Sequence, residues 1–121
     1  MKLLIFISIL VLVYSLPNKF QAIPNNDSLM WFRIRDLQPY MSTLIDRLYE
    51  YEVIDVLHAE HSNLPLEYYK IDFLFSQTDC FQPTNNLTDC VVTGLPIKCF
   101  TNIRISPWTG SGEVKNLTCN L

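Results

Sequence analysis

Residues 99–119 read CFTNIRISPWTGSGEVKNLTC, a stretch in which two cysteines enclose a turn carrying proline and tryptophan. Upstream of the turn, side chains alternate with a period of two, which predicts a strand over residues 96–106. Beyond the turn we expect the last strand, over residues 113–121. Turns usually carry polar residues because they face water, so Trp108 is unusual there. Its indole is either packed under neighbouring strands or held out for a partner.

Further strands are expected before this hairpin. Residues 67–78 alternate clearly, and their aromatic and β-branched content is typical of a central strand. One face of that strand contains Tyr69, Ile71, Phe73 and Phe75. Weaker patterns predict strands over residues 51–59 and 91–93, and residues 62–66 are expected to form a turn.

One amphipathic helix is expected upstream of the strands. Its apolar residues recur at intervals of three and four and form one stripe: Leu37, Tyr40, Met41, Leu44, Ile45 and Leu48. Asp36 can cap its start, and Pro39 is tolerated in the first turn. A helix followed by several antiparallel strands predicts an α+β fold, in which one helix packs across a curled antiparallel sheet of about five strands.

The chain of 121 residues is long enough for one domain, which we place at residues 36–121. Near the N-terminus one lysine precedes a short apolar run, the pattern of a secretory signal peptide rather than of a membrane span. We expect the signal peptide at residues 1–15, with cleavage between about residues 15 and 22. Residues 16–35 are then expected to form an N-terminal arm.

Three glycosylation sequons agree with export. They begin at Asn26, Asn86 and Asn116, and each has the Asn-x-Ser/Thr pattern. Together with the signal peptide, they predict a secreted, extracellular glycoprotein, which we expect to be a soluble monomer.

The four cysteines are Cys80, Cys90, Cys99 and Cys119. An even number of cysteines in a small exported domain predicts disulfides, and four cysteines allow three pairings. Their spacing favours neighbouring partners, Cys80 with Cys90 and Cys99 with Cys119. Zinc is the other interpretation, but the chain has no Cys-x-x-Cys pair and both histidines lie far upstream, so we expect no metal.

Charge and motifs argue against several other classes of function. The formal net charge is −3 and no basic run is present, so nucleic acid and anionic membranes are not expected partners. Nothing resembles a nucleophile elbow or another catalytic setting, so we expect neither an enzyme nor a cofactor. His58 and His61 would point to opposite faces of a strand and converge poorly on a metal.

The order of these parts resembles that of secreted (type 2) members of the cystatin superfamily. The matched parts are, in order, the helix from Asp36, a strand ending at Cys80, a loop to Cys90, a strand through Cys99, the Pro107-Trp108 turn, and a strand ending at Cys119. The resemblance implies a five-stranded antiparallel sheet wrapped round the helix, with two disulfides flanking the Pro-Trp hairpin.

The resemblance also implies a function, because inhibitory cystatins have a three-part wedge. This wedge plugs the cleft of papain-like cysteine proteases such as cathepsins. The parts are an N-terminal arm with a glycine, a first hairpin reading Gln-x-Val-x-Gly, and the Pro-Trp hairpin. Here the first hairpin falls at residues 62–66, which read SNLPL, and the first glycine of the chain is Gly94. The expected protease contacts are Pro107, Trp108, Leu64, Pro65 and Leu66.

The two missing parts argue against ordinary tight inhibition. The alternative is a non-inhibitory secreted protein of the same fold with a reproductive, secretory or host-defence binding role, as in the cystatin-related epididymal group. Residues 93–99 and 117–120 also resemble cathelicidin propieces, but no cationic segment follows, so no released cationic peptide is expected. An indole held clear of the strands would favour the inhibitor, and a buried indole the alternative.

Overall fold

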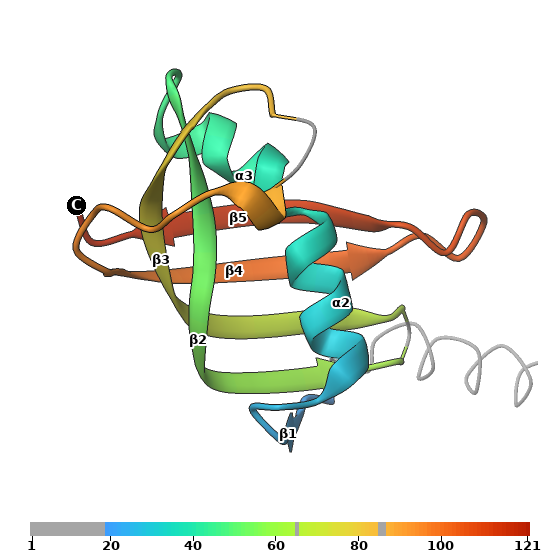
Figure 1. The fold of residues 1–121 in the computed structure, drawn as a ribbon. Helices are drawn as coiled ribbons and strands as arrows, with labels where there is room; N and C mark the ends of the chain where they lie inside the picture. Colours follow the sequence, from blue (N-terminus) through green and yellow to red (C-terminus); the bar gives the residue numbers. More distant parts are fainter. Residues whose placement is uncertain (1–18, 65, 85–86) are drawn as a thin grey trace, which may run out of the picture.

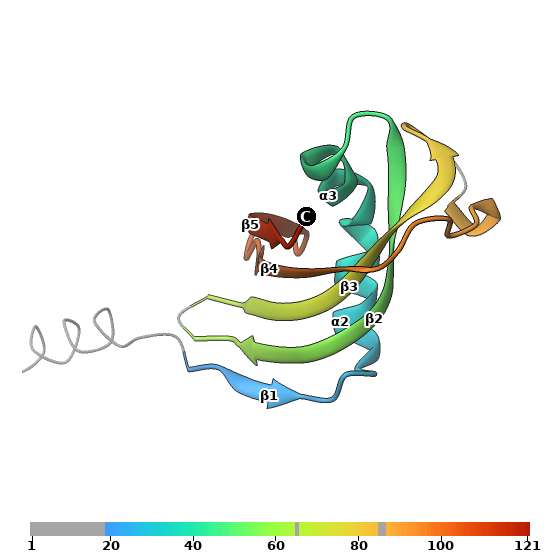
Figure 2. The same cartoon turned by 90° about the vertical axis from the view of Figure 1, so that its left-hand side faces the viewer.

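In the part of the chain that the structure describes, five antiparallel strands form a single sheet whose spatial order follows the sequence (Figure 1). The computed structural model describes residues 19–121, apart from residue 65 and residues 85–86. The strands are β1 (Gln21–Ile23), β2 (Tyr49–Ser62), β3 (Tyr68–Phe81), β4 (Ile97–Ile105) and β5 (Gly112–Cys119). Figure 2 shows β2 and β3 curving around the helices. A short 3₁₀ helix, η1 (Leu87–Asp89), lies between β3 and β4.

Among the described residues, two helices cover one face of this sheet, where the sequence predicted one. They are α2 (Ser28–Asp36) and α3 (Gln38–Ile45). The carboxylate of Asp27 caps α2 by accepting the Met30 N–H at 3.0 Å. Pro39 lies in the first turn of α3, where its missing N–H is not needed. The predicted helix is therefore present as α3, but the prediction of a single helix is wrong, because α2 precedes it. The segment expected to be an arm, residues 16–35, contains β1 and all of α2 except Asp36.

The core lies between the helices and the sheet. Its buried apolar residues are Met30, Ile34, Met41, Val53, Val56, Ala59, Tyr69, Ile71, Phe73, Phe75, Cys99, Ile103 and Ile105. The alternation predicted for β3 is confirmed, since all four residues of its apolar face are buried. The helical stripe is confirmed only in part, because Met41 is buried whereas Tyr40, Leu44 and Leu48 are exposed.

The expected α+β fold is confirmed, but one strand lies elsewhere than predicted. Residues 91–93 form no strand, and Val92 makes a single bridge to Thr78. The fifth strand is β1, which pairs with β2 through Gln21 and His61. Residues 1–15, predicted to be the signal peptide, lie outside the described residues. None of the described helices is long and apolar enough to cross a membrane.

Two buried polar side chains attach α3 to β2. The amide oxygen of Gln38 accepts the Val53 N–H at 2.8 Å, and the hydroxyl of Ser42 accepts the Tyr51 N–H at 2.8 Å. Both side chains are buried. A buried polar group that lost its partner would cost about 1–3 kcal/mol, so these bonds fix how α3 sits on the strand.

Both disulfides lie on the half of the fold formed by β3, β4 and β5. Cys80 is bonded to Cys90, and Cys99 to Cys119, which is the pairing that the spacing favoured. Cys99 and Cys119 are also direct register partners in the β4–β5 ladder. Their bond therefore closes the hairpin at the end opposite its turn.

Candidate functional site

Strand register brings three segments of the chain to one end of the sheet. Ser62 pairs with Tyr68, Tyr68 with Arg104, and Arg104 with Glu113, so the β2–β3 and β4–β5 turns start side by side. Gln21 pairs with His61, which places residues 19–20 at the same end. We call residues 19–20, 63–64, 66–67 and 106–111 the loop edge. Both turns point to the right-hand side in Figure 1.

The turn between β4 and β5 projects the indole into solvent. Trp108 is 92% exposed and Pro107 is exposed beside it. The backbone of the turn is closed by Ser106, whose carbonyl accepts the Gly110 N–H at 2.8 Å and whose N–H donates to the Ser111 carbonyl at 2.9 Å. Gly110 has a φ of +72°, the left-handed conformation that favours glycine. The turn is thus ordered by its backbone, while its largest side chain contacts little of the protein.

Two arginines stabilise this turn through hydrogen bonds, one to the turn itself and one between the strands that lead into it. Arg33 of α2 donates from Nη1 to the Gly110 carbonyl at 2.6 Å. Arg104 of β4 donates to the Glu113 carboxylate of β5 at 2.8 Å. That hydrogen bond is the main reason why the pKa of the Glu113 carboxyl lies below its ordinary value, with the charge of Lys115 adding to it.

The turn between β2 and β3 presents a second apolar side chain. Leu64 is 67% exposed, and Leu66 is half-buried. The buried hydroxyl of Ser62 donates to the Leu64 carbonyl at 3.1 Å, so this serine organises the turn. Pro65, the remaining expected contact, lies outside the described residues.

Charged and aromatic groups fill the base of the loop edge. His61 Nε2 lies 3.6 Å from the Glu67 carboxylate, and the His61 ring packs on the Tyr69 ring with centroids 4.6 Å apart. Burial raises the pKa of the Tyr69 phenol, and the carboxylates of Glu67 and Asp27 add to the shift. At the N-terminal segment, Lys70 Nζ lies 4.0 Å above the Phe20 ring.

The predicted glycosylation sites and the two histidines lie outside the loop edge. Asn26 is exposed in the turn before α2, and Asn116 is exposed on β5, while Asn86 lies outside the described residues. His58 pairs with Glu60 at 3.2 Å rather than with His61. Among the residues that the structure describes, no group of three His, Cys, Asp or Glu side chains could hold a metal ion.

Sequence reasoning missed two residues that shape the site. Arg33 lies 77 residues from the carbonyl that it binds, and no local pattern marks such a contact. Ser106 was seen only as part of a turn, although its hydroxyl also accepts the N–H groups of Trp108 and Thr109, at 3.3 and 3.4 Å. A serine directly before the Pro107-Trp108 pair could have indicated a side chain that caps the turn.

A helix-covered antiparallel sheet with two adjoining turns and a neighbouring N-terminal strand is the arrangement of the cystatin fold. No known family model and no curated protein matches this sequence. Solved structures do match, at low identity. Dimeric human cystatin F superposes with a TM-score of 0.75 at 17% identity, covering 87% of this chain and 88% of that one.

Two tick proteins give similar agreement. A salivary cystatin from the soft tick Ornithodoros moubata has a TM-score of 0.69 at 17% identity, covering 88% of this chain and 100% of that one. Mialostatin, a gut cystatin from the hard tick Ixodes ricinus, has a TM-score of 0.67 at 17% identity, covering 84% and 97%. The chain therefore has the cystatin fold.

Proposed function

We propose that this protein is a secreted cystatin-like inhibitor that docks the loop edge into the cleft of a papain-like cysteine protease. Trp108 is the anchor, Pro107 stiffens its turn, and Leu64, Pro65 and Leu66 form the second contact. The chain supplies no nucleophile or base in this proposal, since an inhibitor of this kind only fills the cleft. The signal-like N-terminus, the two disulfides and the exposed sequon asparagines support export.

The observation that carries the proposal is the exposure of Trp108. An indole that is 92% exposed on an ordered turn contributes almost nothing to the protein's own core. Burying it in a cleft would remove a large apolar area from water at little entropic cost, because the turn is already ordered. Tryptophans with this placement are common interface hot spots.

Inhibition of papain and of a panel of cathepsins tests the proposal directly. We expect wild-type protein to inhibit at least one of these enzymes, and Trp108→Ala to weaken inhibition about thirtyfold, since truncating a hot spot costs about 2 kcal/mol. Leu95→Ala is the matched control, because Leu95 is 89% exposed at the other end of β4. Full protease activity at high micromolar wild-type protein would reject the proposal.

The second candidate is a non-inhibitory binding protein of the same fold. The β2–β3 turn favours it, because Leu66 stands where inhibitory members have a glycine that allows close backbone approach. The described N-terminal segment also has no glycine before α2. A folded protein that leaves every protease in the panel active would support this candidate.

A further inference from the structure

A buried carboxylate lies at the end of the sheet opposite the loop edge. Glu50, near the start of β2, is only 2% exposed, and its Oε2 has no hydrogen-bond partner among the described residues. Burying an ionised carboxylate without a partner is costly, so such groups are normally paired with a cation or with several donors. The backbone carbonyl of Glu50 accepts the Thr78 hydroxyl at 2.8 Å, but this hydrogen bond does not involve the carboxylate.

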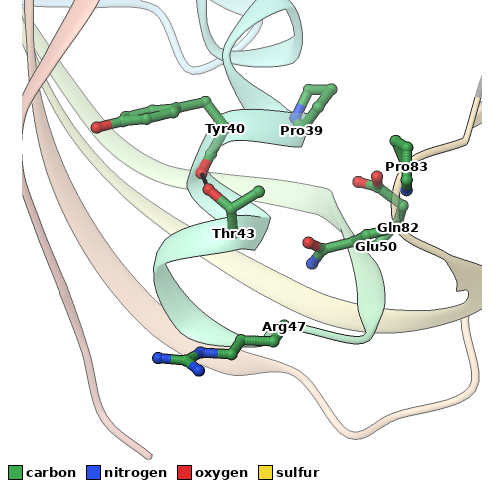
Figure 3. A pocket seen from close by; sticks show the side chains of 7 residues that line it. All are labelled: Pro39, Tyr40, Thr43, Arg47, Glu50, Gln82 and Pro83. Carbon is green, nitrogen blue, oxygen red and sulfur yellow. Dashed lines mark hydrogen bonds between the residues drawn. The ribbon is translucent and has the colours of Figure 1, made fainter.

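Glu50 borders an open cavity of about 420 Å³, which we call the Glu50 pocket. The cavity lies between α3 and the chain that follows β3 (Figure 3). Its other walls include the rings of Pro39, Tyr40 and Pro83. A volume of this size is in the range of small-molecule sites, which are about 300–1,000 Å³.

The frame of the Glu50 pocket is fixed by hydrogen bonds. The Gln82 N–H donates to the Leu48 carbonyl at 2.8 Å, and its side-chain amide donates to the carbonyls of Asp46 and Tyr49. These bonds hold the segment after β3 against the start of β2. The walls of the pocket are therefore formed in the free protein, but the buried Glu50 side chain must turn toward the cavity before its carboxylate can meet a ligand.

The walls of the pocket favour one kind of ligand. The Arg47 side chain extends away from Glu50 (Figure 3), and no ion pair between the two is present in the described residues. Proline and tyrosine rings suit an apolar stem, and the half-exposed Tyr40 ring can also attract a cation. A metal ion would need more oxygen ligands than one carboxylate supplies.

We propose that the Glu50 pocket binds an organic cation, namely a protonated amine or a guanidinium on a short apolar stem. The cationic head would donate to the Glu50 carboxylate, and the stem would pack on Pro39, Tyr40 and Pro83. Such a group occurs both in free amines and in lysine or arginine side chains of a partner protein. The pocket is separate from the loop edge, so both can be occupied at once.

Chemical-shift titration of the full folded chain tests this proposal. The probes are n-butylammonium and methylguanidinium, with n-butanol and butyrate as neutral and anionic controls. We expect saturable shifts of backbone amides in residues 40–50 and at Gln82 with the two cations only. Absence of saturable shifts, or equal binding of butanol or butyrate, would overturn the proposal.

Two matched variants test whether the cationic probe binds to the carboxylate of Glu50. Glu50→Gln preserves shape but removes the charge, and we expect it to weaken n-butylammonium binding about tenfold or more. Glu52→Gln makes the same change on the same strand outside the pocket, and we expect less than a twofold effect. Equal affinity in wild type and Glu50→Gln would contradict the assignment.

A third variant covers the case in which Glu50→Gln does not fold. Tyr40 is half-exposed, so Tyr40→Ala is expected to fold and to weaken n-butylammonium binding severalfold by removing a wall. Unchanged affinity in Tyr40→Ala would count against the pocket. The peptide acetyl-Gly-Lys-Gly-amide distinguishes the two sources of the cation. If the peptide binds as tightly as n-butylammonium, the pocket is assigned to a side chain of a partner protein. If n-butylammonium binds more tightly, the pocket is assigned to a free amine.

Discussion

Gly110 sets the shape of the turn that presents Trp108. Its φ of +72° is strained for any residue with a side chain, although a Cβ at this position would meet no atom within 4 Å. The Arg33 guanidinium binds the carbonyl of the same residue at 2.6 Å, so the conformation is held from outside the turn as well. Backbone geometry, and not space, is therefore what requires glycine here.

Gly110→Ala is expected to lower the free energy of unfolding by about 1 kcal/mol, since the left-handed conformation costs an alanine about that much. Urea denaturation measures the difference. Ser111→Ala, a neighbouring exposed position, is the control and is expected to change stability by less than about 0.5 kcal/mol. If Gly110→Ala proves as stable as wild type, the turn does not depend on the left-handed conformation.

The β4–β5 hairpin is fastened at both ends. The Cys99–Cys119 disulfide closes it far from the turn, and the Arg104–Glu113 pair links the strands near the turn. The pair is solvent-exposed, so its contribution is small and decreases in salt. Its place between the disulfide and Trp108 nevertheless ties the strand ends together where the turn begins.

The Arg104–Glu113 pair makes the stability of the hairpin depend on pH. The hydrogen bond from Arg104 holds the pKa of Glu113 below its ordinary value of 4.5. A carboxyl with a lowered pKa stabilises the folded state above the unfolded pKa, and this stabilisation is lost as the pH falls through the folded value. Glu113→Gln is therefore expected to lower Tm at pH 7, and to match wild type at about pH 2.

A double-mutant cycle provides the control for this prediction. Arg104→Gln combined with Glu113→Gln is expected to lower Tm at pH 7 by less than the sum of the single changes, because the partners share one interaction. Additive effects, or a Glu113→Gln deficit that persists at acidic pH, would mean that the pair does not stabilise the hairpin.

Across the molecule, the sheet was more predictable than the helices. The strict alternation in β3 and β4 reports burial on one face only, so both strands and their buried residues followed from the sequence. The stripe from Leu37 to Leu48 misled because it begins at the break between α2 and α3 and runs past Ile45, where α3 ends. The three residues of β1 pair with residues 36 to 40 positions away, and so short a strand has no pattern of its own.

The candidate site was predictable to the same degree. Its exposed residues, Trp108 and Leu64, lie in turns that proline marks plainly in the sequence, and glycine also marks the turn of Trp108. Their proximity depends on the pairing of β3 with β4, and their support depends on Arg33. The Glu50 pocket had no sequence signal, because it forms only where α3, β2 and the segment after β3 meet.

Docking of Trp108 into a protease cleft is the central claim, and its fluorescence tests that claim most directly. Trp31 is the second tryptophan, so Trp31→Phe leaves Trp108 as the single indole of this chain, and the emission of the protease's own tryptophans is recorded separately and subtracted. We expect its emission to shift to shorter wavelength when papain or a cathepsin is added, because the indole leaves water. A protease whose cleft is already blocked by a covalent inhibitor is expected to cause no shift. An emission unchanged by the free protease, or shifted equally by the blocked one, would contradict docking through the loop edge.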